Sequence, residues 1–207
     1  MLLESKSVNI SRGLAFRNTK PDYILKLPHR DRREEFKSDE EFANFRAIPG
    51  TNEQFFRSAS LIDNTYGRVK TVESLVIRYS IKSALCLAET EEELARYFRD
   101  YSCDNYIKML YREGHIISIH DDQAKALYKI TLAQPGPHLI FCQAGKDRTG
   151  AFATAIAALA GASEREIVRD YMLSYVNNNG LKSSDPVYQK IKRRFVHDFR
   201  RKYPHYS

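Results

Sequence analysis

The chain contains no tryptophan and only three cysteines, Cys86, Cys103 and Cys142. An odd number of cysteines at uneven spacing suits neither a disulfide framework nor a zinc site built on paired cysteines. Histidine is also scarce, and the six that are present match no metal-binding spacing. We therefore expect a reducing compartment, the cytoplasm, and a protein that uses no metal and no cofactor.

Long apolar segments are missing as well. The opening residues MLLESKSVNISRGLAF place acidic and basic side chains where a secretory signal needs an apolar core. The longest apolar run, residues 151–160, is too short to cross a bilayer. We expect neither a signal peptide nor an integral membrane segment.

Acidic residues are outnumbered, because 33 lysines and arginines face 26 aspartates and glutamates and give a net charge of +7. Such a balance is typical of proteins that meet nucleic acid, an anionic membrane surface or a phosphorylated substrate. The stretch PHRDRREEFKSDEEF alternates in sign, which is typical of a solvated face, and KIKRRFVHDFRRKY is denser but has its apolar residues at helical spacing. No RNA-binding or helix-turn-helix signature is present. Charge therefore indicates an anionic ligand, and we expect no nucleic acid partner.

Short apolar runs alternate with helical patterns along the chain and predict an α/β fold. We expect strands near 55–61, 82–88, 115–119 and 138–141, forming a central, mostly parallel sheet flanked by helices. The length of 207 residues favours a single domain, with residues 1–43 as an N-terminal extension. Asp185-Pro186 begins a final helix, expected over residues 185–203, that packs through an apolar stripe.

Three further helices have sequence signals at their N-termini. Thr90 with Glu93, and Ser163 with Glu166, match the capping box, in which a hydroxyl and a carboxylate each bind the other residue's backbone N–H. Asp121 or Asp122 can cap a helix between the strands at 115–119 and 138–141.

The segment HLIFCQAGKDRTG, residues 138–150, places a cysteine and charged residues in a turn between a predicted strand and an alanine-rich helix that we expect to begin around residues 148–150. Unpaired N–H groups at a helix N-terminus favour an anion there. Ala144 and Gly145 are small enough for the backbone to close around a ligand, and Arg148 offers a planar fork that matches two phosphate oxygens. The turn therefore predicts a cradle for a tetrahedral oxyanion.

A cysteine in such a cradle is a candidate nucleophile, because helix N-termini and nearby cations favour the thiolate. Cys142 would attack a bound phosphate and form a phosphocysteine that water then hydrolyses, with the Thr149 hydroxyl assisting the sulfur as it leaves. The alternative is a small core residue, which is the usual role of a lone cysteine after an apolar strand. A nucleotide-binding P-loop does not fit, because Ile140 stands where that motif needs Gly and Asp147 where it needs Ser or Thr.

CQAGKDRTG resembles the signature loop of the cysteine-dependent tyrosine and dual-specificity phosphatase superfamily, in the AGKDRTG form of a bacterial branch of atypical tyrosine and lipid phosphatases. Two other segments, NFRAIPG…FFRSASL (44–61) and GASEREIVRDYMLSY (161–175), resemble motifs of that branch, so the resemblance spans residues 44–176. It implies a phosphatase-type fold, with Cys142 as nucleophile and Arg148 as phosphate clamp. It also implies a cradle made by the backbone of Gln143, Ala144, Gly145, Lys146, Asp147 and Arg148.

The chain departs from the superfamily pattern in two places. Phe141 stands where a histidine usually precedes the cysteine, and Cys86 and Ala88 stand where the branch often carries Asp and Arg. The resemblance assigns the general acid to Asp147, while Asp121 and Asp122 are alternatives whose other role is to cap a helix.

The sequence thus predicts a phosphomonoester hydrolase that acts on protein phosphotyrosine. The alternatives are a phosphoinositide or dual-specificity phosphatase of the same mechanism, favoured by Lys146 at the mouth of the site, and a catalytically weak phosphate-binding pseudophosphatase. The expected partner is a phosphorylated protein or a phosphoinositide substrate.

Overall fold

The computed structural model describes residues 21–119 and 136–206. Its sheet has five strands in the order β1-β2-β5-β3-β4. The strands are β1 (Arg46–Ala47), β2 (Phe55–Ser58), β3 (Ser83–Cys86), β4 (Ile116–Ser118) and β5 (His138–Phe141). β1 runs antiparallel to β2, and every other neighbouring pair is parallel. The expected α/β fold with a mostly parallel sheet is confirmed, and the antiparallel edge strand is an addition to it.

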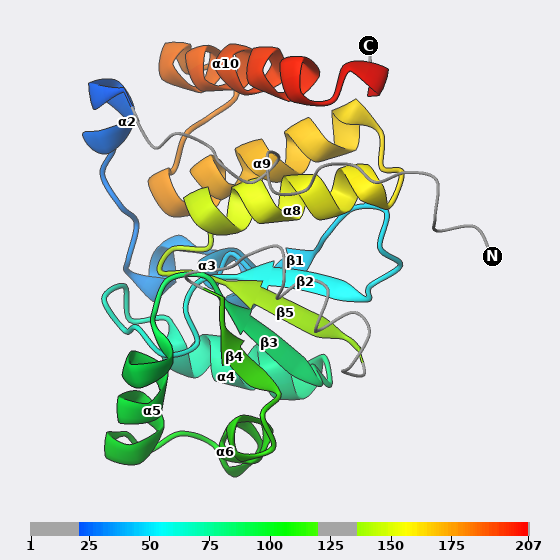
Figure 1. Cartoon of the computed structure of the whole chain (residues 1–207). Helices are drawn as coiled ribbons and strands as arrows, with labels where there is room; N and C mark the ends of the chain where they lie inside the picture. The colour runs from blue at the N-terminus through cyan, green and yellow to red at the C-terminus, as the bar shows by residue number, and fades with distance from the viewer. Residues whose placement is uncertain (1–20, 120–135, 207) are drawn as a thin grey trace, which may run out of the picture.

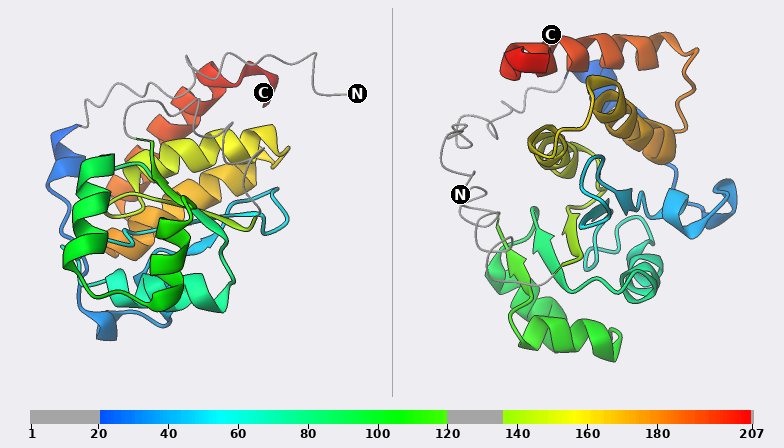
Figure 2. Two further views of the ribbon diagram at one scale, coloured as in Figure 1. Left: turned by 60° about the horizontal axis from the view of Figure 1, so that its bottom comes forward. Right: turned by 90° about the vertical axis from the view of Figure 1, so that its right-hand side faces the viewer.

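Helices cover both faces of this sheet (Figure 1). The helical segments are α2 (Asp22–Leu25), η1 (Arg33–Glu35), α3 (Asp39–Phe42), α4 (Val69–Arg78), α5 (Glu91–Asp100), α6 (Asn105–Arg112), α8 (Asp147–Leu159), α9 (Glu164–Asn179), α10 (Pro186–Lys202) and η2 (Pro204–Tyr206). The second view in Figure 2 shows the sheet between α8 and α9 on one side and α4 on the other, with α10 as a further layer beyond α9.

Strand β5 lies in the middle of the sheet, and all four of its residues are buried. Phe141 lies level with Ser58 of β2 and with Cys86 of β3, so these three parallel strands end at the same edge. A strand buried on both faces needs a continuous apolar run, which explains the sequence HLIF. The chain leaves this edge at Cys142 and enters α8 five residues later.

Two apolar clusters divide the core, and β5 contributes alternate residues to each. Leu139 and Phe141 join the cluster formed with α4, α5 and α6, which we call the α4-side cluster. Ile140 and Cys142 join the cluster formed with α8, α9 and α10, the α8-side cluster. Cys142 therefore faces α8, whereas Cys86 belongs to the α4-side cluster on the opposite face.

The predicted helix boundaries are largely confirmed. Both capping boxes are formed, Thr90 with Glu93 at α5 and Ser163 with Glu166 at α9. Helix α9 ends at Gly180, whose φ of 65° lies in the left-handed region.

The final helix packs as its apolar stripe predicts. Pro186 is the first residue of α10, and Ile191, Phe195 and Phe199 are buried. The Phe195 ring stacks on Tyr171 of α9 with centroids 3.8 Å apart and an interplanar angle of 9°.

Some predictions differ from the structure or fall outside it. Helix α8 begins at Asp147, just before the expected 148–150, and α2, α3 and α6 had no sequence prediction. The helix expected after Asp121 or Asp122 lies outside the described residues. Within the described ranges, no helix has both the length and the apolar character needed to cross a membrane.

The burial of Phe141 yields a stability prediction. Its side chain is fully buried in the α4-side cluster, where a histidine would place polar nitrogens among apolar groups. We expect Phe141→His to lower the free energy of unfolding by about 1–3 kcal/mol more than Phe141→Leu, because a buried polar group without a partner keeps its desolvation penalty. Urea denaturation of the two variants measures the difference. Equal losses would mean that position 141 tolerates a polar ring.

Candidate active site

Residues 142–146 form a tight turn between β5 and α8, at the edge where the parallel strands end. Cys142 is buried, with 3% of its surface exposed, and lies in the α8-side cluster. Ligands of parallel α/β sheets bind at this edge. The structure thus places the candidate nucleophile where the sequence puts it, between the sheet and the N-terminus of α8.

Gly145 fixes the path of this turn. Its φ is +63°, and a Cβ added to it would lie 2.2 Å from the carbonyl oxygen of Ser58 at the end of β2. Residues other than glycine rarely adopt this region of φ, and here backbone atoms also occupy the space that a Cβ would need. Gly145 therefore allows the turn to close against β2.

A buried arginine on β2 forms a hydrogen bond with the backbone of the turn. Arg57 of β2 has no exposed surface, and its Nη2 donates to the carbonyl oxygen of Gly145 at 2.8 Å. Its Nη1 forms an ion pair with Asp170 of α9. One side chain thus connects the sheet, the turn and α9.

Arg46 and Asn44 extend this contact. Arg46 Nε lies 2.5 Å from the other carboxylate oxygen of Asp170, and Arg46 Nη1 donates to Asn44 Oδ1 at 2.6 Å. Asn44 is buried, and its Nδ2 donates to the Gly145 carbonyl oxygen at 2.9 Å. The Gly145 carbonyl therefore accepts hydrogen bonds from both Asn44 and Arg57.

This network sets the charge of Asp170 and the direction of the peptide group between Gly145 and Lys146. Burial alone would raise the pKa of Asp170, but the charges of Arg46 and Arg57 and their hydrogen bonds hold that pKa below its usual value. Asp170 is thus a carboxylate at neutral pH. Because N–H and C=O point in opposite directions across a trans peptide, fixing the Gly145 carbonyl toward Arg57 directs the Lys146 N–H away from it.

The Lys146 side chain does not lie at the mouth of the site, contrary to expectation. It is buried, its Nζ donates to Asn179 Oδ1 at 3.0 Å, and it lies over the Tyr175 ring at 5.0 Å from the centroid. Asn179 and Tyr175 both belong to α9. The long side chain reaches back under the turn, because a partner amide and an aromatic face there replace water around the ammonium.

Arg148 is the second residue of α8 and is exposed. Its Nη1 donates to the carbonyl oxygens of Leu87 at 3.2 Å and Ala88 at 3.3 Å, just beyond the end of β3. Nη1 is the only atom of this guanidinium that donates a hydrogen bond within the described residues. As far as the described residues go, the remaining N–H groups of the guanidinium are available to an anion.

Thr149 is fully buried, and its hydroxyl has no hydrogen-bond partner among the residues that the structure describes. An unpaired buried hydroxyl costs about 1–3 kcal/mol. A negatively charged atom that forms close to this hydroxyl during a reaction would accept a hydrogen bond from it and remove that cost.

The expected acids are only partly placed. Asp147 is the first residue of α8 and is half-buried. Burial raises the pKa of Tyr66, and the charges of Asp63 and Asp147 raise it further, while Arg68 opposes the effect. The Asp147 carboxylate therefore lies within electrostatic reach of Tyr66, in the segment that follows β2. Asp121 and Asp122 lie outside the described residues.

Sequence reasoning missed Asp63. Its Oδ2 accepts a hydrogen bond from Nε2 of Gln143, the residue after the candidate nucleophile, at 2.8 Å. Burial acts to raise the pKa of Asp63, but hydrogen bonds from Thr65 and Gln143 outweigh it and lower the pKa. Asp63 thus remains ionised and orients Gln143.

Glu89 was missed as well. The Cys86 thiol donates to Glu89 Oε2 at 2.8 Å, and burial raises the pKa of Glu89, with Arg148 acting in the opposite direction. Asp63 and Glu89 follow β2 and β3, so the rule that polar residues after parallel strands share one edge could have found both.

Groups of three or more His, Cys, Asp or Glu side chains able to hold a metal do not occur within the described ranges.

Comparison with known proteins decides the family. The model of the tyrosine phosphatase family matches residues 35–204. The chain belongs to the tyrosine phosphatase family. It is therefore a cysteine-dependent phosphatase and acts on a phosphorylated substrate. This confirms the resemblance that the motifs indicate, and the match extends beyond residues 44–176 in both directions.

Two solved structures are also similar to this chain. A crystal structure of the core catalytic domain of the PP-IP phosphatase SIW14 from S. cerevisiae is 19% identical, covers 72% of this chain and 83% of its own, and has a TM-score of 0.42. A second structure of the Siw14 catalytic core is 17% identical, covers 74% and 92%, and has a TM-score of 0.38. No curated protein matches the chain.

Gly145 and Gly161 provide a matched pair for testing the turn. Both have positive φ, but a Cβ at Gly161 would meet nothing within 4 Å. We expect Gly161→Ala to cost about 1 kcal/mol of stability and to leave phosphatase activity unchanged. Gly145→Ala should cost more and abolish activity, because the turn must move away from Ser58. Denaturation curves and turnover of p-nitrophenyl phosphate report the two effects, and equal behaviour of the variants would refute the role given to Gly145.

Proposed function

We propose that this phosphatase hydrolyses phosphomonoesters through a phosphocysteine on Cys142, with protein phosphotyrosine as its substrate. The observation that carries the proposal is the turn before α8, whose Gly145 carbonyl is held by Arg57 and Asn44 on the side away from the Lys146 N–H. Residues 1–207 would form one phosphatase domain, since both apolar clusters are built on the same sheet.

In the first step the Cys142 thiolate attacks phosphorus in line with the ester oxygen. The new S–P bond forms as the P–O bond to the leaving group breaks, and an acid donates a proton to the departing oxygen. The backbone N–H groups of residues 143–148 and the guanidinium of Arg148 bind the equatorial oxygens, whose charge grows in the transition state.

In the second step water attacks phosphorus and the S–P bond breaks. The conjugate base of the same acid takes the proton from water, and inorganic phosphate is released. The Thr149 hydroxyl, buried and unpaired in the described structure, is suited to donate to the sulfur as its negative charge returns. That hydrogen bond would make the thiolate a better leaving group.

Asp147 is the proposed general acid, because it begins α8 beside the cradle and the resemblance to the phosphatase branch assigns it this role. Glu89 is a second candidate that the structure adds. It lies just beyond β3, next to the carbonyl groups that hold Arg148, and its raised pKa suits a proton donor. Asp121 and Asp122 remain alternatives from the sequence.

The position of Lys146 bears on the substrate. A cation at the mouth would favour phosphoinositides with several phosphates, but this ammonium is bound by Asn179 beneath the turn. We therefore place phosphotyrosine ahead of phosphoinositides. Phe141 supports the weaker alternative of a pseudophosphatase, because it removes the histidine that usually neighbours the cysteine.

The nucleophile is tested by comparing wild type with Cys142→Ser on p-nitrophenyl phosphate, phosphotyrosine peptides and short-chain phosphoinositides. We expect wild type to turn over the peptides fastest and Cys142→Ser to be inactive on all three while still binding a phosphate analogue. Wild type that binds the analogue but turns over nothing between pH 5 and 8 would leave a phosphate-binding module instead.

The acid is tested with Asp147→Asn, Glu89→Gln and the exposed control Glu92→Gln. Loss of the acid should slow phenyl phosphate, which has a poor leaving group, by about 10²–10⁴-fold and p-nitrophenyl phosphate far less. We expect this pattern from Asp147→Asn alone. The same pattern from Glu89→Gln would reassign the role to Glu89, and no effect from either would move it to Asp121 or Asp122.

A further inference from the structure

Nearly all the net charge of the chain lies on one helix. Helix α10, Pro186–Lys202, contains seven lysines and arginines and one aspartate, hence a net charge of +6, against +7 for the whole chain. A charge asymmetry of this size creates a strong local potential. The phosphatase site does not use it, since α10 contributes no residue to the turn before α8.

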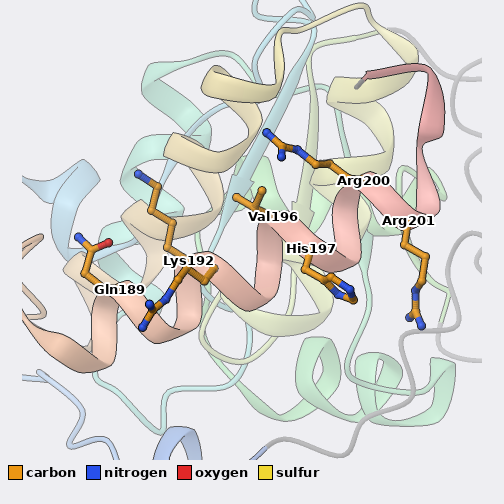
Figure 3. A pocket seen from close by; sticks show the side chains of 7 residues that line it. Gln189, Lys192, Val196, His197, Arg200 and Arg201 are labelled. Carbon is orange, nitrogen blue, oxygen red and sulfur yellow. The ribbon is translucent and has the colours of Figure 1, made fainter.

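The packing of α10 fixes which way these cations face. Ile191, Phe195 and Phe199 are buried against the body of the protein. Residues on the other side of the helix form a stripe along a shallow groove, which we call the α10 basic stripe; Figure 3 shows side chains of this stripe on α10. Its members are Gln189, Lys192, Arg193, Val196, His197, Arg200 and Arg201.

Few acids neutralise this stripe. Glu164 binds Arg200 with two contacts of 2.9 Å, and Asp198 lies 3.7 Å from Arg201. Lys192 and Arg193 are exposed and have no acidic partner within the described residues. The stripe therefore keeps uncompensated positive charge where an anionic surface can reach it.

We propose that the α10 basic stripe binds the surface of an anionic lipid bilayer. The stripe from Gln189 to Arg201 spans about 18 Å along one straight helix, at 1.5 Å per residue, and so presents its charges in a line to a flat surface. The apolar side of α10 is already used in the core, so the contact is electrostatic and does not require insertion.

This mode of binding leaves the phosphatase site open. In Figure 1, α10 is the outermost layer on its side of the molecule, and the turn before α8 lies below α8 at the sheet. A bilayer against α10 would hold the enzyme at the membrane without covering Cys142. The proposal does not depend on which phosphate ester the enzyme hydrolyses.

The test is co-sedimentation of the full chain with phosphatidylcholine vesicles that either contain or lack phosphatidylserine. We compare wild type with Lys192→Glu/Arg193→Glu and with the control Lys82→Glu/Arg112→Glu, which makes the same change in net charge at exposed sites outside α10. Thermal unfolding and p-nitrophenyl phosphate turnover verify that all three proteins are folded and active.

We expect wild type and the control to bind only the phosphatidylserine vesicles, more weakly as salt is added. The α10 variant should bind at least about 30-fold more weakly, because each lost basic residue removes about 1 kcal/mol near an anionic surface and the introduced carboxylates add repulsion. An equal loss of vesicle binding in the control would show that net charge alone drives binding, and it would overturn the proposal. Failure of wild type to bind vesicles, including the case in which it binds single-stranded RNA or an acidic peptide instead, would also overturn it.

Discussion

The ion pair between Arg57 and Asp170 is the contact on which the site depends. Arg57 has no exposed surface, so its charge is tolerated only because Asp170 and backbone carbonyls surround it. Removing one partner of a buried pair costs about 3–5 kcal/mol, because the other charge is left alone in a medium that solvates it poorly. The same guanidinium holds the Gly145 carbonyl. A single buried charge thus couples the stability of the fold to the shape of the turn that carries Cys142.

Much of this arrangement follows from local sequence. The run HLIF predicts a buried strand, and the capping boxes at Thr90 and Ser163 predict the starts of α5 and α9, because each signal depends on neighbouring residues. Gly145 is also locally readable. The residues that hold the turn are not, since Arg57 and Asp170 are 113 positions apart and meet only in the folded chain.

The motifs that resemble the phosphatase branch gain a physical meaning here. Asn44, Arg46 and Arg57 come from the segment 44–61, and Asp170 comes from 161–175. These segments, separate in sequence, meet behind the turn through the hydrogen bonds of Asp170 and of the Gly145 carbonyl. The direction of Lys146 could not be predicted, because nothing near it in sequence shows that Tyr175 and Asn179 lie beneath the turn.

The central claim is that Cys142 carries the phosphoryl group during turnover. Rapid acid quenching of the enzyme with a phosphotyrosine peptide, followed by mass spectrometry of the digested protein, tests this directly. The account predicts a transient phosphate on the peptide that contains Cys142, appearing before inorganic phosphate is released. A phosphate on another residue, or turnover without any phosphoenzyme at the earliest quench times, would contradict it.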